Sequence, residues 1–393
     1  MSVAAKIQRA MASQSWIRQM FELGIQLKQE HGDENVFDLS LGNPILEPPE
    51  EVAEALKRLA SDPPAGMHRY MPNAGYAETR AAIAAHLASQ TGLPFMAAHT
   101  VMTCGAGGAL NIIFKSILNP GEEVIIFAPF FPEYPFYADN HGATTTVAPT
   151  DEAFCPDLDA LAPMLSARTK AVLVNSPNNP SGALYPADLL GQLGGLLARA
   201  EAEFGTSIYL ISDEPYSQLT YDGLETPPIF HAHARSILAT SFSKNLALPG
   251  ERIGYVAVNP GCPDAGPLVD ALTYCNRVLG FVNAPALMQW LVRDALTASV
   301  DVGWYARKRD FLYNELTGMG YSMVKPQGAF YAFPASPNPD DVAFVKELLQ
   351  WNVLVTPGTG FGSPGFFRIS FCLEDRVLEG AMHGFREAIA AYR

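Results

Sequence analysis

Short apolar runs rich in β-branched residues alternate with helical stretches through the middle of the chain. The runs 124–127 and 172–174 are continuously apolar, which is typical of strands buried on both faces of a sheet. Strands are expected at 100–103, 123–128, 171–175, 207–212, 237–241 and 253–259. Helical periodicity separates several of them, most clearly at 187–203. This alternation predicts an α/β layered domain with a largely parallel sheet.

The two ends of the chain have a different pattern. Residues 1–30 are amphipathic with helical spacing, and a long helical pattern runs from 286 to 316. After it, helix and short strands mix, which indicates a smaller α+β unit.

Composition and charge exclude several classes of protein. With 48% hydrophobic and 17% charged residues, the chain can bury a large core, which excludes wholesale disorder. The 26 basic residues stand against 40 acidic ones, a net charge of −14. Such a surface repels nucleic acid and anionic lipid, so neither is an expected partner. No stretch is long and apolar enough to span a membrane.

The five cysteines predict neither a disulfide framework nor a metal site. They are widely spaced and form no C-x-x-C motif. His231 and His233 have the spacing of a metal-binding pair on a strand, but no third ligand accompanies them, so a loop is the better interpretation. The N-terminal residues lack the apolar core of a signal peptide, and we therefore expect a reducing, cytoplasmic location.

Polar or glycine-rich segments follow almost every expected strand. These segments are 105–108, 129–134, 175–182, 212–216 and 241–244. In an open α/β sheet, ligands bind beyond the carboxyl ends of the strands. Five such segments meeting at one edge would build a large polar site.

Each segment also has a purely structural interpretation. Gly105–Gly108 can hold a phosphate at a helix N-terminus, but a tight strand-to-helix turn explains it equally well. Asp213 follows an apolar run and needs a cationic partner or several donors; a helix cap or an ion pair would also satisfy it. Lys244 would ordinarily be solvated, whereas a partly desolvated lysine becomes an amine nucleophile toward carbonyls.

Together these segments contain the parts that a pyridoxal phosphate site requires. The cofactor needs a lysine for its aldehyde, an acid for its ring nitrogen, donors for its ring oxygen, an aromatic residue for its ring face and an anion cup for its phosphate. Ser241, Ser243 and Arg252 supply hydroxyls and a fixed cation that suit a phosphate dianion.

The segment 241–255 resembles the lysine signature of the class I/II aminotransferases, the aspartate aminotransferase-like branch of the fold type I pyridoxal phosphate enzymes. The loop 175–182 is similar to that family's N-P-x-N-P-x-G element, and 211–216 to its aspartate–tyrosine element. Further similar segments lie at 41–44, 70–80, 328–331, 357–362 and 367–371. The resemblance covers residues 30–393.

The resemblance implies a two-part fold. A large domain would hold a mostly parallel mixed sheet covered by helices on both faces, and a smaller α+β domain would be made from both chain ends. The implied boundaries are 1–45 for an N-terminal arm and part of the small domain, 46–285 for the large cofactor-binding domain, and 286–393 for a long connecting helix and the C-terminal small domain.

The resemblance also assigns roles in cofactor chemistry. Lys244 would form the internal aldimine and move the proton between the substrate and the cofactor. Asp213 would pair with the pyridinium, and Tyr216 and Asn179 would hydrogen-bond the ring oxygen. Phe131 would stack on the ring, where many relatives have tryptophan or tyrosine.

Binding roles follow in the same way. The phosphate would be held by Ala106, Gly107, Ser241, Ser243 and Arg252. The turn at Ala106 lacks the hydroxyl or amide side chain often found there, so backbone groups would matter more. Tyr70 would reach the phosphate of a neighbouring subunit, which implies a homodimer with shared sites. Arg368 would clamp the substrate α-carboxylate, with Gly42 and Asn179 nearby.

The implied activity is transfer of an amino group between an L-amino acid and a 2-oxo acid by a ping-pong mechanism, as part of amino-acid metabolism. Arg277 could reach the partner's site and favour an aspartate- or glutamate-type donor, or it could be a surface arginine. Phe130, Phe131, Phe136 and Phe281 could instead line a pocket for a neutral or aromatic donor. A carbon–sulfur lyase on the same scaffold is the alternative enzyme. A non-catalytic regulatory module is disfavoured by the net charge and by the lack of room for a DNA-binding domain at the N-terminus.

Overall fold

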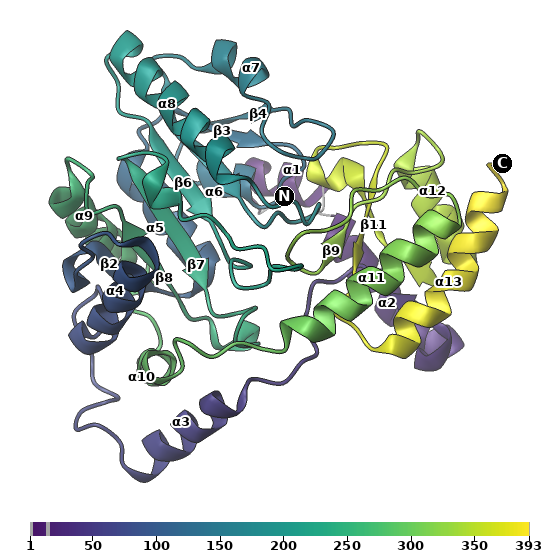
Figure 1. Ribbon diagram of the computed structural model, residues 1–393, viewed down its shortest axis with the longest axis horizontal. Coiled ribbons are helices and arrows are strands. Elements are labelled where there is room, and N and C mark those ends of the chain that lie inside the picture. Colours follow the sequence, from purple (N-terminus) through teal and green to yellow (C-terminus); the bar gives the residue numbers. More distant parts are fainter. Residues whose placement is uncertain (1–2, 13–15, 393) are drawn as a thin grey trace.

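A seven-stranded sheet forms the centre of the computed structural model, which describes residues 3–12 and 16–392 (Figure 1). The strand order is β2-β8-β7-β6-β5-β3-β4. The strands are β2 (Thr100–Thr103), β3 (Glu123–Phe127), β4 (Thr144–Ala148), β5 (Thr169–Asn175), β6 (Tyr209–Asp213), β7 (Ser236–Ser241) and β8 (Gly254–Val258). Neighbouring strands from β4 to β7 are parallel, whereas β8 is antiparallel to both β2 and β7. The predicted mostly parallel mixed sheet is confirmed.

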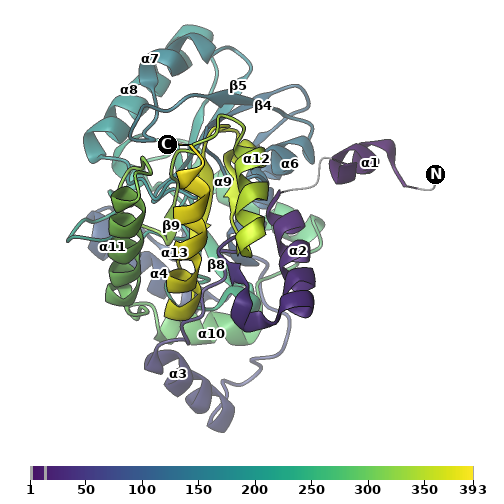
Figure 2. The same ribbon diagram turned by 90° about the vertical axis from the view of Figure 1, so that its right-hand side faces the viewer.

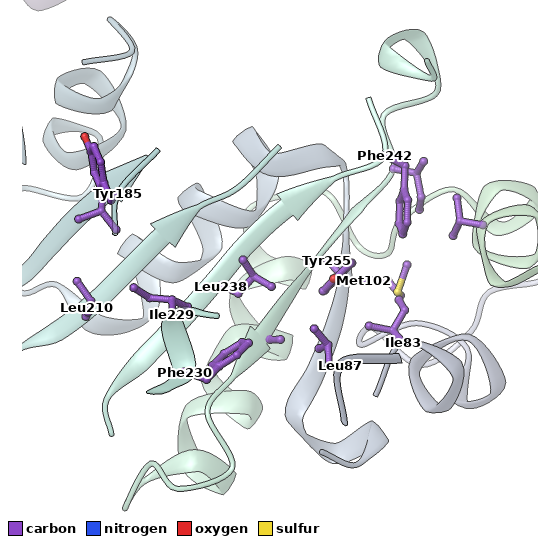
Figure 3. Close-up of a cluster of buried hydrophobic side chains, with 14 of the residues drawn as sticks. Ile83, Leu87, Met102, Tyr185, Leu210, Ile229, Phe230, Leu238, Phe242 and Tyr255 are labelled. Carbon is purple, nitrogen blue, oxygen red and sulfur yellow. The ribbon is translucent and has the colours of Figure 1, made fainter. Parts of the chain in front are cut away.

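Helices cover both faces of this sheet. On β5, Ala171 and Leu173 pack into one apolar cluster, and Val172 and Val174 pack into another. The first cluster lies against α5 (Gly105–Ile117), α6 (Tyr134–Asp139) and α9 (Ala265–Val278). The second lies against α4 (Ala77–Thr91), α8 (Ala187–Phe204) and α10 (Ala286–Asp294), with α3 (Glu50–Ser61) beyond, and Figure 3 shows part of it. Burial on both sides explains why these strands are continuously apolar.

Both chain ends contribute to a second, smaller unit beside the large sheet (Figures 1 and 2). Strand β1 (Phe37–Asp38) pairs in parallel with β10 (Val353–Leu354), and β12 (Phe367–Ser370) lies between β11 (Thr356–Pro357) and β9 (Tyr331–Ala332). The accompanying helices are α2 (Trp16–His31), α11 (Val302–Gly318), α12 (Asp341–Leu348) and α13 (Asp375–Ala390). Met20 and Leu39 share one core with Phe385. The smaller α+β unit made from both ends is therefore confirmed, while the boundaries near residues 45 and 285 stay predictions.

The single long helix expected over 286–316 is wrong. The chain forms α10 and α11 instead, with residues 295–301 between them. In this break the backbone N–H of Val300 donates to the carbonyl of Asn245, and the Val300 side chain is buried in the smaller core. This tertiary contact prevents a continuous helix.

The N-terminal pattern divides into α1 (Ala5–Ala12) and α2, and residues 13–15 lie outside the described part of the chain. Lys6 on α1 forms an ion pair with Asp139 on α6 at 2.6 Å. None of the described helices is long and apolar enough to cross a membrane.

Candidate active site

A cavity of about 300 Å³ opens at the carboxyl edge of the parallel strands. The last residues of three neighbouring strands line it: Asn175 of β5, Asp213 of β6 and Ser241 of β7. The structure brings all the predicted site residues into this lining except Tyr70 and Arg277. Those in the lining are Gly42, Ala106, Gly107, Phe131, Asn179, Asp213, Tyr216, Ser241, Ser243, Lys244, Arg252 and Arg368.

Lys244 follows the end of β7 and lines the cavity. Its Nζ donates a hydrogen bond to the carbonyl oxygen of Gly42 at 3.0 Å and lies 5.3 Å from the ring centre of Phe330. Burial lowers the pKa of its ammonium to about 8, and the nearby positive charges of Arg368 and Arg252 act in the same direction. A larger fraction of this lysine is therefore free amine at neutral pH than of an ordinary lysine.

Asp213 is almost fully buried and is only half satisfied. The hydroxyl of Tyr134 donates to Oδ2 at 2.6 Å, whereas Oδ1 is buried without a hydrogen-bond partner. Burial raises the pKa of this carboxyl to about 6, and the Tyr134 hydrogen bond opposes that rise. The free oxygen is suited to a cationic N–H group, because a buried carboxylate oxygen needs such a partner.

Asn175 fixes the geometry around Asp213. Its Nδ2 donates to the Asp213 carbonyl at 2.8 Å, and its Oδ1 accepts from the backbone N–H of Asn179 at 2.8 Å. The end of β6 and the 175–182 loop are thereby held together.

Arg368 on β12 is 2% exposed, and one of its three guanidinium nitrogens has no hydrogen-bond partner. Its Nη1 donates to Oδ1 of Asn179 at 3.1 Å, and its Nη2 donates to the carbonyl of Ser40. Its Nε is buried without a partner, and the rings of Tyr331 and Phe361 lie 4.7 and 4.8 Å from the guanidinium carbon. A fixed, desolvated guanidinium of this kind is suited to binding a carboxylate.

The start of α5 forms an anion cradle. The first-turn N–H groups of a helix lack intrahelical partners and favour an anion. Gly105 has φ +72°, and a Cβ there would lie 3.0 Å from Nη2 of Arg252. A Cβ on Gly107 would lie 3.1 Å from the hydroxyl of Tyr137. Small residues therefore keep open the space that Arg252 borders.

The cavity fits pyridoxal phosphate. It contains a lysine with a lowered pKa, a carboxylate oxygen without a partner and an anion cradle around Arg252. These are the features expected for its aldehyde, ring nitrogen and phosphate.

Two predicted site residues lie outside the lining. Tyr70 is 90% exposed. Arg277 is exposed on α9, with its guanidinium carbon 5.3 Å from the ring centre of Tyr274. Of the phenylalanines proposed for an apolar or aromatic pocket, Phe131 lines the cavity, whereas Phe130, Phe136 and Phe281 do not.

Sequence reasoning missed several residues that line the cavity, among them Tyr134, Tyr137, Asn175 and Tyr331. Tyr331 places its hydroxyl 2.9 Å from that of Tyr216. All four lie in or beside segments that the sequence had singled out, but Tyr134 and Tyr331 pair with residues that are distant in the chain. His233, by contrast, bonds the carbonyl of Ile208, and the described residues contain no cluster of three potential metal ligands.

The chain is similar to known proteins along nearly its whole length. A family described as "Aminotransferase class I and II" matches residues 34–385. The aspartate/prephenate aminotransferase of Thermus thermophilus is 34% identical over 89% of this chain and 90% of its own. The aspartate aminotransferase of Pyrococcus horikoshii is 31% identical over 95% and 94%.

Solved structures give the same result. An amino transferase from Eubacterium rectale has 37% identity and a TM-score of 0.96, covering 100% of both chains. The Thermus thermophilus aspartate aminotransferase with maleate has 31% identity and a TM-score of 0.87, covering 99% of this chain and 100% of that one.

Proposed function

Because the chain belongs to the class I and II aminotransferases, which depend on pyridoxal phosphate, we propose that the cavity transfers an amino group from an acidic L-amino acid to a 2-oxo acid. The observation that carries the proposal is the meeting of three groups in one cavity. These are the Lys244 amine, the unpaired Oδ1 of Asp213 and the unpaired Nε of Arg368.

Lys244 and Asp213 perform the central chemistry. When bound, pyridoxal phosphate supplies an aldehyde that reacts with amines and a ring that withdraws electrons from the substrate α-carbon. Lys244 would hold the aldehyde, and its amine would move the proton between the substrate α-carbon and the cofactor. Its lowered pKa supports this base role at neutral pH. Asp213 keeps the ring nitrogen protonated through Oδ1, since its Oδ2 is engaged by Tyr134.

Other residues orient the cofactor. Tyr216 and Asn179 would donate to the ring oxygen, and Phe131 would supply the aromatic face for the ring. The phosphate is held by the backbone of Ala106 and Gly107, the hydroxyls of Ser241 and Ser243, and the guanidinium of Arg252. Their position in a single lining supports these roles.

Arg368 binds the substrate α-carboxylate beside Gly42 and Asn179. Its hydrogen bonds to Asn179 and to the Ser40 carbonyl fix the guanidinium. The side chain therefore loses little conformational freedom when the carboxylate binds.

The enzyme acts as a homodimer with shared sites. Tyr70, at 90% exposed, and the exposed pair Tyr274 and Val278 on α9 are large apolar side chains at the surface that a second copy would bury. Tyr70 then reaches the phosphate in the partner's site, and Arg277 meets the side-chain carboxylate of an acidic donor. The relatives from Thermus and Pyrococcus, named for aspartate, support that donor class. The five free cysteines support a cytoplasmic location.

A spectral titration of the purified holoenzyme with a panel of amino acids tests the proposal. Amino donors convert the absorbance of the aldehyde form of the cofactor to that of the amine form, and aspartate or glutamate should do so at the lowest concentrations. A panel in which neutral donors convert the band and acidic ones do not would refute the donor class.

The Arg277→Ala variant tests the distal contact. Removing one partner of a charged pair costs about 2–5 kcal/mol, or about 30- to 4000-fold in kcat/KM. The loss should fall on aspartate and spare alanine. Arg199→Ala, an exposed arginine on α8, is the matched control. An equal loss for both donors would assign Arg277 to structure.

A further inference from the structure

The anion cradle at the start of α5 has no side-chain donor of its own. Gly105 is followed by Ala106, Gly107 and Gly108, and none of these residues carries a polar side chain. The backbone N–H groups of the turn can bind an anion, because they lack partners within the helix. A phosphate group has three strong acceptor oxygens. Donors from other elements of the fold can therefore join this cradle.

Tyr137 of α6 reaches the turn through its hydroxyl. A Cβ added to Gly107 would lie 3.1 Å from the hydroxyl oxygen of Tyr137 and 3.8 Å from its Cζ. The hydroxyl is therefore the part of the ring nearest to the turn. Tyr137 and Gly107 both line the cavity. The Tyr137 ring packs beside Phe131 against the apolar cluster on this face of the sheet, and this packing holds the hydroxyl in place.

The Tyr137 hydroxyl is free to bind a ligand. Within the part of the chain that the structure describes, it has no hydrogen-bond partner. Tyr134, one turn earlier on α6, differs in this respect, because its hydroxyl donates to Asp213 at 2.6 Å.

The hydroxyl also keeps its proton at neutral pH. Burial raises the pKa of Tyr137 to about 12, and the negative charges of Glu133 and Asp213 act in the same direction, whereas Arg252 opposes them. A protonated phenol can donate a hydrogen bond to an anion without adding a negative charge beside it.

Arg252 approaches the same turn one step earlier. A Cβ on Gly105 would lie 3.0 Å from its Nη2, while its Nη1 donates to the carbonyl of Pro249 at 3.0 Å. Arg252 and Tyr137 both line the cavity. An anion on the turn would therefore meet a guanidinium near Gly105 and a hydroxyl near Gly107.

We propose that the Tyr137 hydroxyl donates a hydrogen bond to the phosphate of the cofactor, through the space that Gly107 leaves free of a Cβ. Tyr137 thereby supplies the side-chain donor that the turn 106–108 lacks. This inference rests on the proposed function, in which Ala106 and Gly107 hold the phosphate, and it adds one residue to that site.

Binding of pyridoxamine phosphate and of pyridoxamine to the cofactor-free chain tests the contact without turnover. The two ligands differ only in the phosphate, and both carry an amine in place of the aldehyde, so neither reacts with Lys244. Tyr137→Phe should weaken pyridoxamine phosphate about 10- to 150-fold, as expected for a lost hydrogen bond to a charged group. Affinity for pyridoxamine should stay within about twofold of wild type.

The matched control is Tyr313→Phe. Tyr313 lies half-buried on α11, outside the cavity lining, and its variant should bind both ligands as wild type does.

Gly107→Ala tests the same contact while the Tyr137 ring stays in place. Its Cβ should push the hydroxyl away from the phosphate, because 3.1 Å is too close for an undisturbed contact. In the Tyr137→Phe background the nearest ring atom is Cζ at 3.8 Å, an ordinary contact distance. Gly107→Ala should therefore cost less affinity for pyridoxamine phosphate in that background than in wild type.

Three results would overturn the role of Tyr137: unchanged affinity of Tyr137→Phe for pyridoxamine phosphate, an equal loss for both ligands, or an equal cost of Gly107→Ala in the two backgrounds. A different result would refute the proposed function itself. If the wild-type chain bound pyridoxamine phosphate no more tightly than pyridoxamine, the turn would not be a phosphate site.

Discussion

Raising the pH of the cofactor-free protein should convert Lys244 to its amine well before an ordinary lysine. With a pKa of about 8, the amine fraction is about 1% at pH 6, about 10% at pH 7 and about half at pH 8. The reactivity of Lys244 toward an acylating reagent should therefore rise about fifty-fold between pH 6 and pH 8. Above pH 8 it should rise by only about twofold more and then stay constant. An unperturbed lysine, with a pKa of about 10.4, would still gain about tenfold per unit over the same range.

Competitive labelling with acetic anhydride and peptide mapping measures this directly, with exposed Lys57 on α3 as the internal standard. Burial is the largest cause of the lowered pKa, so Arg368→Gln should leave the pH of the plateau almost unchanged. If the plateau of Arg368→Gln moved to a much higher pH, the cationic neighbours would be the main cause of the lowered pKa of Lys244. Reactivity of Lys244 that keeps climbing tenfold per unit above about pH 8 would refute the reasoning altogether.

Three further outcomes are expected. Tyr134→Phe removes a charge-assisted hydrogen bond of about 1.5–3 kcal/mol and should raise the pKa of Asp213 by about 1–2 units. Relative to wild type, cofactor affinity measured by fluorescence quenching should then fall more at about pH 6 than at about pH 8, and an equal change at both would contradict this. Arg368→Lys loses the guanidinium fork and should raise KM for amino acids about 10- to 150-fold, while reaction with a simple amine that lacks a carboxylate stays unchanged. Hybrid dimers of Tyr70→Phe with Lys244→Ala subunits should regain one intact site, and no recovery would argue for self-contained sites.

Strands buried on both faces could be predicted from the sequence, whereas the edge strand β4 could not. β5 is apolar over residues 171–174 and β6 over residues 209–211, because helices cover both sides of the sheet. β4 reads Thr-Thr-Thr-Val-Ala, and Thr144 and Val147 are exposed at the end of the sheet. Because β4 has a neighbouring strand on one side only, its side chains are partly exposed. Its sequence therefore lacks the continuous apolar run that marks the central strands.

The site divides in a similar way. Lys244, Asp213 and Arg368 were identified because each lies in a segment with a recognisable local pattern. Tyr134 was missed because its partner, Asp213, is 79 residues away and only the fold brings them together. The missing partner of Oδ1 in Asp213 was equally invisible, since a missing hydrogen bond is a property of packing and not of sequence.

The contact between Arg368 and the Ser40 carbonyl can form only after nearly the whole chain has been synthesised. The cavity is therefore completed late in translation. The two residues are 328 positions apart, and β1 likewise has to wait for β10. The ribosome delivers every strand of the seven-stranded sheet before it delivers β12. A nascent chain can therefore assemble the lysine and aspartate side of the cavity while the guanidinium is still untranslated. In the proposed function, the residue that binds the amino-acid carboxylate is therefore synthesised last, and we expect truncated products of this chain to be inactive toward amino acids.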